Sequence, residues 1–229
     1  MKIAVLGTGM VGQTLAGRLA ALGHQVTVGT RDPEATLARA ASPEGAGTPA
    51  YSSWQAEHPA VRLATFGAAA EQAELIINAT AGGASLQALA SAGPANLDGK
   101  VILDVANSLD FSRGFPPSLS VVNTDSLAEQ IQRAHPTARV VKSLNTMNCR
   151  VMVDPARVPG EHVVFVSGDD SDAKATVAGV LGELGWAPGA IWDLGGLSTA
   201  RGAEMLMPVW LSIMQKLGSG DFNFAIARV

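Results

Sequence analysis

The sequence predicts an α/β fold, a doubly wound and mostly parallel sheet with a small C-terminal extension. Three observations support this prediction. The chain opens with an apolar run from Ile3 to Leu6, then a glycine-rich turn, then apolar residues at helical spacing up to Gly23. Short apolar runs alternate with helical stretches further along, as in parallel sheets with crossover helices. An apolar helical stretch from Leu206 to Leu217 closes the pattern.

The composition is that of one sizeable α/β domain. Of 229 residues, 47% are hydrophobic and 16% are charged, and the net charge is -4. Since there is no Lys/Arg cluster, we expect neither nucleic acid nor a membrane surface as a partner. The single cysteine, Cys149, excludes an internal disulfide, and no signal peptide or membrane span is recognisable. We therefore expect a cytoplasmic protein without a metal site, and the high hydrophobic fraction suggests an oligomer interface.

The turn from Gly7 to Gly12 is typical of Rossmann-type dinucleotide-binding proteins, in which a strand, a glycine turn and a helix follow one another. Gly7 would permit the tight turn and Gly9 would let a pyrophosphate approach the backbone. Gly12 would let the helix pack closely on the strand. The unpaired N–H groups at the helix start favour a negative group there. A plain strand-to-helix connection is the alternative, but a second strand from Gln25 to Val28 favours the dinucleotide site.

The end of the second strand indicates which dinucleotide binds. An NAD site normally carries Asp or Glu here, about 20 residues after the glycine turn. Residues 28 to 30 carry neither. Thr30 and Arg31 instead offer a hydroxyl and a guanidinium, which suit a 2′-phosphate and favour NADP. Alternatively, Arg31 could be a solvated cation at the surface without a role in binding. Asp32 before Pro33 is predicted to cap the next helix.

The loops that follow later strands should line the ligand crevice, because ligands bind at the carboxyl ends of strands in such sheets. These strands are predicted at 61–66, 75–78, 100–105, 139–144, 162–166 and 190–193. Asn107 begins a long segment with two prolines, where a second ligand would be held. Asn145, Thr146 and Met147 could shape a pocket, although each loop could also be an ordinary connection. Residues 41–59 are predicted to be irregular, and Tyr51 or Trp54 there could stack on adenine or form a satellite cluster.

The polar residues offer few proton donors. The four histidines are predicted to lie away from the crevice. Lys142 lies within a strand beside the proposed pocket and is the one candidate donor, although a lysine there more often extends to solvent. Asp169 and Asp170 are predicted to cap a helix. Hydride transfer between two planar cofactors, which depends on positioning, is therefore the favoured chemistry.

Further motifs extend the pattern over almost the whole chain. They are the glycine turn, Val28 to Arg31, Asn145 to Met147, Ser167 to Asp170, Asp193 to Gly195, Ser198 to Arg201 and Phe222 to Phe224. In this order they resemble the NADPH-dependent F420 reductases, also called F420-dependent NADP oxidoreductases, of an actinobacterial type. The resemblance implies hydride exchange between C4 of NADP(H) and C5 of the deazaflavin coenzyme F420, in a homodimer. The chain departs from the better characterised archaeal enzymes at Asn145, where they carry a histidine, and in the excursion at 41–59.

The resemblance also assigns roles by position. Thr8 to Val11 would hold the pyrophosphate, Thr30 and Arg31 the 2′-phosphate, and Ala79 with Thr80 the nicotinamide half. The loop from Asn145 to Met147 would line the deazaflavin. The expected coenzyme-binding residues are thus Gly7, Thr8, Gly9, Met10, Val11, Thr30, Arg31, Ala79, Thr80 and Asn107, and the expected catalytic residues are Asn145, Thr146 and Met147.

We expect one domain, in which residues 1–145 form the dinucleotide-binding core and residues 146–229 complete the crevice and the dimer interface. Two other hypotheses remain open on the sequence alone. One is an NADPH-dependent reductase of a small carbonyl or imine, and the other is a non-catalytic NADP-binding sensor.

Overall fold

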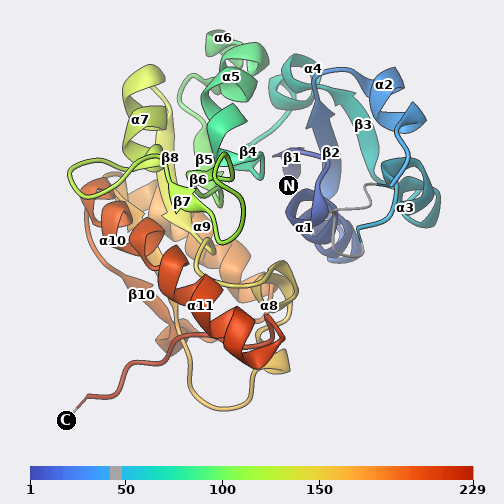
Figure 1. The fold of residues 1–229 in the computed structure, drawn as a ribbon. Coiled ribbons are helices and arrows are strands. Elements are labelled where there is room, and N and C mark those ends of the chain that lie inside the picture. Colours follow the sequence, from blue (N-terminus) through green and yellow to red (C-terminus); the bar gives the residue numbers. More distant parts are fainter. Residues whose placement is uncertain (42–47, 229) are drawn as a thin grey trace.

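Figure 1 shows the computed structural model of the chain, in which residues 1–41 and 48–228 are described. Within them, eight strands form one sheet in the order β10-β9-β8-β5-β4-β1-β2-β3. Neighbouring strands are parallel except β8 and β9. The strands are β1 (Lys2–Leu6), β2 (Gln25–Thr30), β3 (Arg62–Thr65), β4 (Leu75–Asn78), β5 (Val101–Asp104), β8 (Arg139–Ser143), β9 (Val164–Gly168) and β10 (Ile191–Asp193). The predicted doubly wound α/β fold is confirmed.

Helices cover both faces of the sheet, since its strands alternate apolar side chains between the two sides. Ile3 and Val5 of β1 face one hydrophobic cluster, and Ala4 and Leu6 face the other. The first cluster includes side chains of α1 (Met10–Ala21), α3 (Tyr51–Glu57), α8 (Cys149–Val153) and α9 (Ser171–Glu183). The second includes side chains of α4 (Phe66–Glu71), α5 (Gly82–Ala92), α6 (Pro94–Leu97), α7 (Leu127–Ala134) and α10 (Ala200–Met205). Among the described helices, none has the length and apolarity to cross a membrane.

The segment predicted to be irregular contains a helix, α3, which corrects that expectation. Its two large side chains, Tyr51 and Trp54, are buried in the first cluster. The stretch is too short to show a helical period, so tertiary packing rather than local pattern stabilises it. Residues 42–47 of the same segment lie outside the described residues.

The extension begins with two short helices and ends in an extended tail. α10 and α11 (Met207–Leu217) meet at Leu206, and Pro208 lies in the first turn of α11. The apolar helical stretch predicted from Leu206 to Leu217 is thus confirmed as α11. Proline has no N–H to continue the helical ladder, so Pro208 marks where α11 begins after α10. Beyond α11, the ring of Phe222 stacks on Trp210 with centroids 5.3 Å apart. The Val163 N–H donates to the Phe224 carbonyl (3.0 Å), which ties the tail to the chain just before β9.

A short hairpin follows β5. It consists of β6 (Leu109–Asp110) and β7 (Ser118–Leu119), which pair antiparallel. Leu109 and Leu119 pack against Trp210 and its neighbours in α11. Figure 1 shows this hairpin between the sheet and α11. The extension therefore packs on the segment that leaves the carboxyl end of β5.

Candidate coenzyme site

The glycine turn after β1 is closed toward the protein and open toward solvent. Gly7 has a φ of 123°, and a Cβ there would collide with the backbone of Ala79. A Cβ on Gly12 would collide with the Gly7 carbonyl, so α1 can pack this closely only with glycine. A Cβ on Gly9 would meet nothing within 4 Å. The tight turn at Gly7 and the close packing at Gly12 agree with the sequence interpretation, and the open space at Gly9 is compatible with the approach of a pyrophosphate.

The start of α1 suits an anion. Gly9 is its N-cap residue and offers no side-chain cap, and its first turn, which begins with Met10 and Val11, carries no acidic residue. The Gln13 side chain donates to the Thr8 carbonyl (3.0 Å) and so connects α1 to the turn. N–H groups at the start of a 12-residue helix, with the helix dipole behind them, favour a phosphate at this place.

A cavity of about 290 Å³ opens beside this turn. Its wall includes Thr8, Gly9, Thr36, Arg39 and Tyr51. Arg39 brings a cation to this cavity. The Tyr51 hydroxyl has no hydrogen-bond partner among the described residues, and burial raises the Tyr51 pKa well above its usual value. The cavity therefore combines a glycine turn at the start of a helix, a guanidinium and a buried phenol.

Thr30 and Arg31 lie at the carboxyl end of β2, as expected. Thr30 is buried, and the distance between the Thr30 and Thr36 hydroxyl oxygens is 2.8 Å. The Thr36 hydroxyl donates to the Asp32 carbonyl (2.7 Å), so the Thr30 hydroxyl is the donor to Thr36. Arg31 is exposed. The Asp32 side chain accepts from the Ala35 N–H (3.0 Å), which confirms that Asp32 caps α2 (Pro33–Ala38).

Three polar residues, Asn78, Asp104 and Lys142, form a row across neighbouring strands of the sheet. They are in register at the carboxyl ends of β4, β5 and β8. All three are buried. The Lys142 ammonium lies 2.8 Å from Asp104 and 2.9 Å from Glu204 of α10. It also donates to the Ala106 carbonyl.

This geometry corrects both expectations for Lys142, because its side chain neither extends to solvent nor faces the crevice as a free proton donor. Burial by itself would lower the Lys142 pKa, but the carboxylates of Asp104 and Glu204 outweigh burial and raise it above its usual value. Glu204 also accepts N–H groups of Leu127 (2.9 Å) and Ala128 (3.2 Å) at the start of α7. The helix dipole of α7 thus stabilises the second carboxylate.

The loop after β8 is held from two sides. Leu144 adopts a left-handed conformation with φ of 63°, which is rare for a branched side chain and turns the chain sharply before Asn145. The Asn145 amide donates to the Asn107 side-chain oxygen (2.9 Å) and to the Ala203 carbonyl (3.1 Å). Thr146 and Met147 are also buried, and Met147 belongs to the first hydrophobic cluster.

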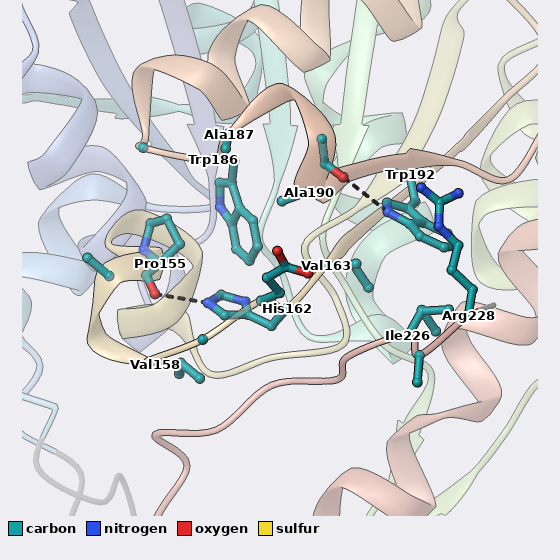
Figure 2. A pocket seen from close by; sticks show the side chains of 16 residues that line it. Pro155, Val158, His162, Val163, Trp186, Ala187, Ala190, Trp192, Ile226 and Arg228 are labelled. Atoms are coloured by element: carbon teal, nitrogen blue, oxygen red, sulfur yellow. Dashed lines mark hydrogen bonds between the residues drawn. The ribbon is translucent and has the colours of Figure 1, made fainter.

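A larger cavity, of about 870 Å³, lies at the other edge of the sheet, near β10 (Figure 2). His162 and Trp186 line it, and the Arg228 guanidinium lies over the Trp192 ring, 5.8 Å from its centroid. None of the sequence-predicted site residues lines this cavity. It is therefore separate from the dinucleotide turn.

The structure brings some predicted residues together and leaves others apart. Ala79 and Thr80 lie against Gly7, and Asn107 pairs with Asn145. Thr30 and Arg31 lie at the carboxyl end of β2, which is separated from β8 by β1, β4 and β5. The sequence interpretation did not identify Asn78, Asp104 or Glu204. A signal was present for two of them, because β4 and β5 are apolar runs that end in a polar residue at the same register.

The fold and the glycine turn define a dinucleotide-binding protein of the Rossmann type. A family model described as "NADP oxidoreductase coenzyme F420-dependent" matches residues 2–108. The F420-dependent NADP reductase of Methanothermobacter marburgensis is 31% identical over 217 residues, which cover 93% of this chain and 92% of that protein. The chain thus belongs to the family of F420-dependent NADP oxidoreductases, as its motifs predict, and is an NADP-dependent oxidoreductase by that membership.

Two further relatives support this assignment to different extents. A crystal structure from Arthrobacter sp. FB24, provisionally described as an F420-dependent NADP reductase, is 58% identical with a TM-score of 0.93, and all of both chains is covered. The rat metalloreductase STEAP3 is 28% identical over 213 residues. Those residues are 91% of this chain, which spans only 38% of the length of STEAP3.

Proposed function

We propose that this protein transfers a hydride between NADP(H) and coenzyme F420, so that NADPH, oxidised F420 and a proton are interconverted with NADP⁺ and reduced F420. The observation that carries the proposal is the arrangement at the carboxyl edge of the sheet. The open glycine turn, Thr80, Asn107 and Asn145 follow four neighbouring strands, β1, β4, β5 and β8. One edge of the sheet can thus hold two ligands next to each other.

The residues around the glycine turn fit a phosphorylated dinucleotide. The open face of Gly9 and the uncapped start of α1 would receive the pyrophosphate. Arg31 would pair with the 2′-phosphate, and Thr30, whose hydroxyl is bound to Thr36, would fix the backbone that presents Arg31. Ala79 and Thr80 lie on the side of the turn where the nicotinamide half would continue.

The loops after β5 and β8 would hold the deazaflavin. Asn107 and the segment from Asn145 to Met147 would form a rigid wall, because Asn145, Thr146 and Met147 are buried and Asn145 is hydrogen-bonded to the half-buried Asn107. When bound, the two coenzymes supply the hydride chemistry themselves. The protein has to orient the two rings and exclude water between them.

The state of Lys142 favours this reaction over reduction of a carbonyl or imine, which needs a proton donor near the hydride acceptor. Lys142 was the one candidate donor, and it is enclosed by Asp104 and Glu204. His24 contacts Glu183, and His162 contacts the Pro155 carbonyl next to the separate cavity. Lys142, His24 and His162 therefore have other partners and do not serve as proton donors at the crevice. Hydride transfer between two coenzymes does not need such a donor from the protein.

The direct test mixes the protein with NADPH and oxidised F420 and follows the visible absorbance of the deazaflavin. We expect that absorbance to disappear in proportion to NADPH consumed, and much more slowly when NADH replaces NADPH. Unchanged absorbance at high protein concentration would overturn the proposal. A panel of imines and carbonyls, tested under the same conditions, would then identify a different acceptor.

We also propose a homodimer that uses α10 and α11. Val209 and Leu217 of α11 are 50% and 58% exposed. Met205 of α10, four positions before Val209, is also exposed. An exposed apolar surface on a helix that otherwise packs on the protein is typical of a subunit interface. Sedimentation should give twice the chain mass, and Val209→Asp should give a folded monomer. A wild-type monomer at micromolar concentration would contradict this proposal.

The division of the chain at about residue 145 is a proposal of the same kind. Residues beyond 145 supply Glu204 to the buried cluster and the Ala203 carbonyl to Asn145, so they would complete the crevice. The cytoplasmic location stays a prediction from the sequence.

A further inference from the structure

A continuous chain of hydrogen bonds connects the buried ion pair with Thr80 at the crevice. Asp104, which is paired with Lys142, accepts from the Asn78 amide nitrogen at 2.8 Å. The Asn78 side-chain oxygen accepts from the Thr80 hydroxyl at 2.7 Å. The Thr80 hydroxyl in turn lies 2.9 Å from that of Ser85. Thr80 is the one partly exposed member of this chain, since the other four side chains are buried.

The direction of each hydrogen bond is fixed by groups that can only donate. Asp104 receives the Lys142 ammonium and the Ala106 N–H (3.2 Å), so it is an acceptor and Asn78 must present its amino group to it. From the other side, the Thr80 backbone N–H points to the Asn78 oxygen at 3.4 Å. Asp104 and the Thr80 N–H therefore require the same orientation of the Asn78 amide, with its nitrogen toward Asp104 and its oxygen toward Thr80.

This orientation determines what Thr80 can offer to a ligand. An amide oxygen cannot donate, so the Thr80 hydroxyl uses its only hydrogen on Asn78. In the contact between the two hydroxyls Ser85 is then the donor, and this 2.9 Å contact is shorter than the 3.4 Å contact of the Ser85 hydroxyl with the Ala81 carbonyl. Thr80 keeps one free lone pair and no free hydrogen, which makes it an acceptor toward the crevice.

We propose that Thr80 is a specificity-determining residue that accepts a hydrogen bond from the amino group of the nicotinamide carboxamide. The inference rests on the proposed function, in which Ala79 and Thr80 run along the nicotinamide half of NADP(H). A carboxamide offers one amino donor and one carbonyl acceptor, and only the donor can bind to Thr80. The Lys142–Asp104 ion pair acts from within the sheet as the positioning element that sets this polarity.

The test compares NADP⁺ with its 3-acetylpyridine analogue, which keeps the carbonyl and replaces the amino group by methyl. Calorimetric titration should show that wild type binds the analogue roughly two- to tenfold more weakly, the range expected for one hydrogen bond. Thr80→Val should bind both ligands with nearly equal affinity. Thr80→Ser should restore the wild-type ratio, and Ser85→Ala, which leaves the Thr80–Asn78 bond in place, should keep it.

Equal affinities of wild type for the two ligands, or an unchanged ratio in Thr80→Val, would overturn the proposal. Because the readout is binding of NADP⁺, it does not depend on the second coenzyme. The expected ratios without any reduction of F420 would show that the hydride partner is wrong while the Thr80 assignment holds. Absence of NADP⁺ binding in folded wild-type protein would overturn both.

Discussion

Asn107 and Asn145 exchange two hydrogen bonds between the loops that follow β5 and β8. The Asn107 amide donates to the Asn145 carbonyl at 2.8 Å, and the Asn145 amide donates to the Asn107 side-chain oxygen at 2.9 Å. The Asn145 amide also reaches the Ala203 carbonyl of α10. One side chain thus joins both crevice loops to the C-terminal extension.

Asn145→Asp should therefore impair hydride transfer. The substitution places a carboxylate oxygen against two oxygens that now receive N–H groups, so we expect a loss of about 1–3 kcal/mol in stability and a raised KM for F420. The matched control is Asn96→Asp, because the Asn96 amide also donates to two carbonyls, those of Gly67 and Ala92, away from the crevice. Asn96→Asp should lose stability while its KM for F420 stays unchanged. Equal changes of KM in the two variants would show that Asn145 does not shape the site.

Lys142→Met should be among the most destabilising substitutions. It leaves Asp104 and Glu204 buried without their cation, and breaking such a pair typically costs about 3–5 kcal/mol. Lys174→Met removes a comparable ion pair, with Asp193, from the surface and should cost less than about 1 kcal/mol. Denaturant unfolding measures both values. A loss for Lys142→Met no larger than that of its control would contradict the account of the buried cluster.

Gly9 and Gly12 of the turn should respond differently to alanine. Gly9→Ala meets open space, so stability should change by less than about 1 kcal/mol, while NADP⁺ affinity should fall at least about tenfold because the methyl occupies the approach of the pyrophosphate. Gly12→Ala collides with the Gly7 carbonyl and should lose stability as well. Thermal unfolding and calorimetry separate the two effects, and full affinity in Gly9→Ala would place the pyrophosphate elsewhere.

Arg31→Ala should weaken NADPH binding roughly ten- to hundredfold, since a charge-assisted contact with phosphate is lost. NADH lacks the 2′-phosphate and should bind almost as before. Arg62→Ala is the charge-matched control, because Arg62 is also exposed but lies at the first position of β3, away from the carboxyl edge. Fluorescence titration with both nucleotides checks this. Parallel losses for NADPH and NADH would exclude Arg31 as the reader of the 2′-phosphate.

Acid should remove a contribution that Asp125 makes to stability. The Arg133 guanidinium donates to both Asp125 oxygens, at 3.0 and 2.7 Å, and lowers the Asp125 pKa from 3.8 to about 2. Because the folded-state pKa is the lower one, this stabilisation is complete above about pH 4 and is lost as the pH falls toward 2. Asp125→Asn should thus melt below wild type at pH 7 and level with it near pH 2.

The partner substitution Arg133→Gln should reproduce this behaviour, since it removes the same ion pair from the other side. A melting difference between wild type and Asp125→Asn that persists unchanged to pH 2 would show that the ion pair is not its cause.

The parts of the fold that follow from local pattern could be predicted from the sequence. Apolar runs such as Leu75–Asn78 and caps such as Asp32 depend on residues within a few positions of each other, and the structure confirms them. α3 could not be predicted in this way, because Tyr51 and Trp54 are stabilised by strands and helices distant in sequence. For the same reason, the sequence offered Lys142 only as a proton donor beside the pocket or as a lysine that extends to solvent. Glu204, 62 positions further on, encloses it instead.

The sequence by itself determined the class of protein. The glycine turn, the order of the motifs along the chain and the family resemblance can all be recognised from residues close together in sequence. Only the tertiary structure decided how the crevice is supported. The pairing of β4, β5 and β8 places Asn78, Asp104 and Lys142 side by side, and Glu204 completes the cluster from α10. Whether a buried charge is compensated depends on neighbours in space, and a donor or acceptor role such as that of Thr80 depends on a chain of such neighbours.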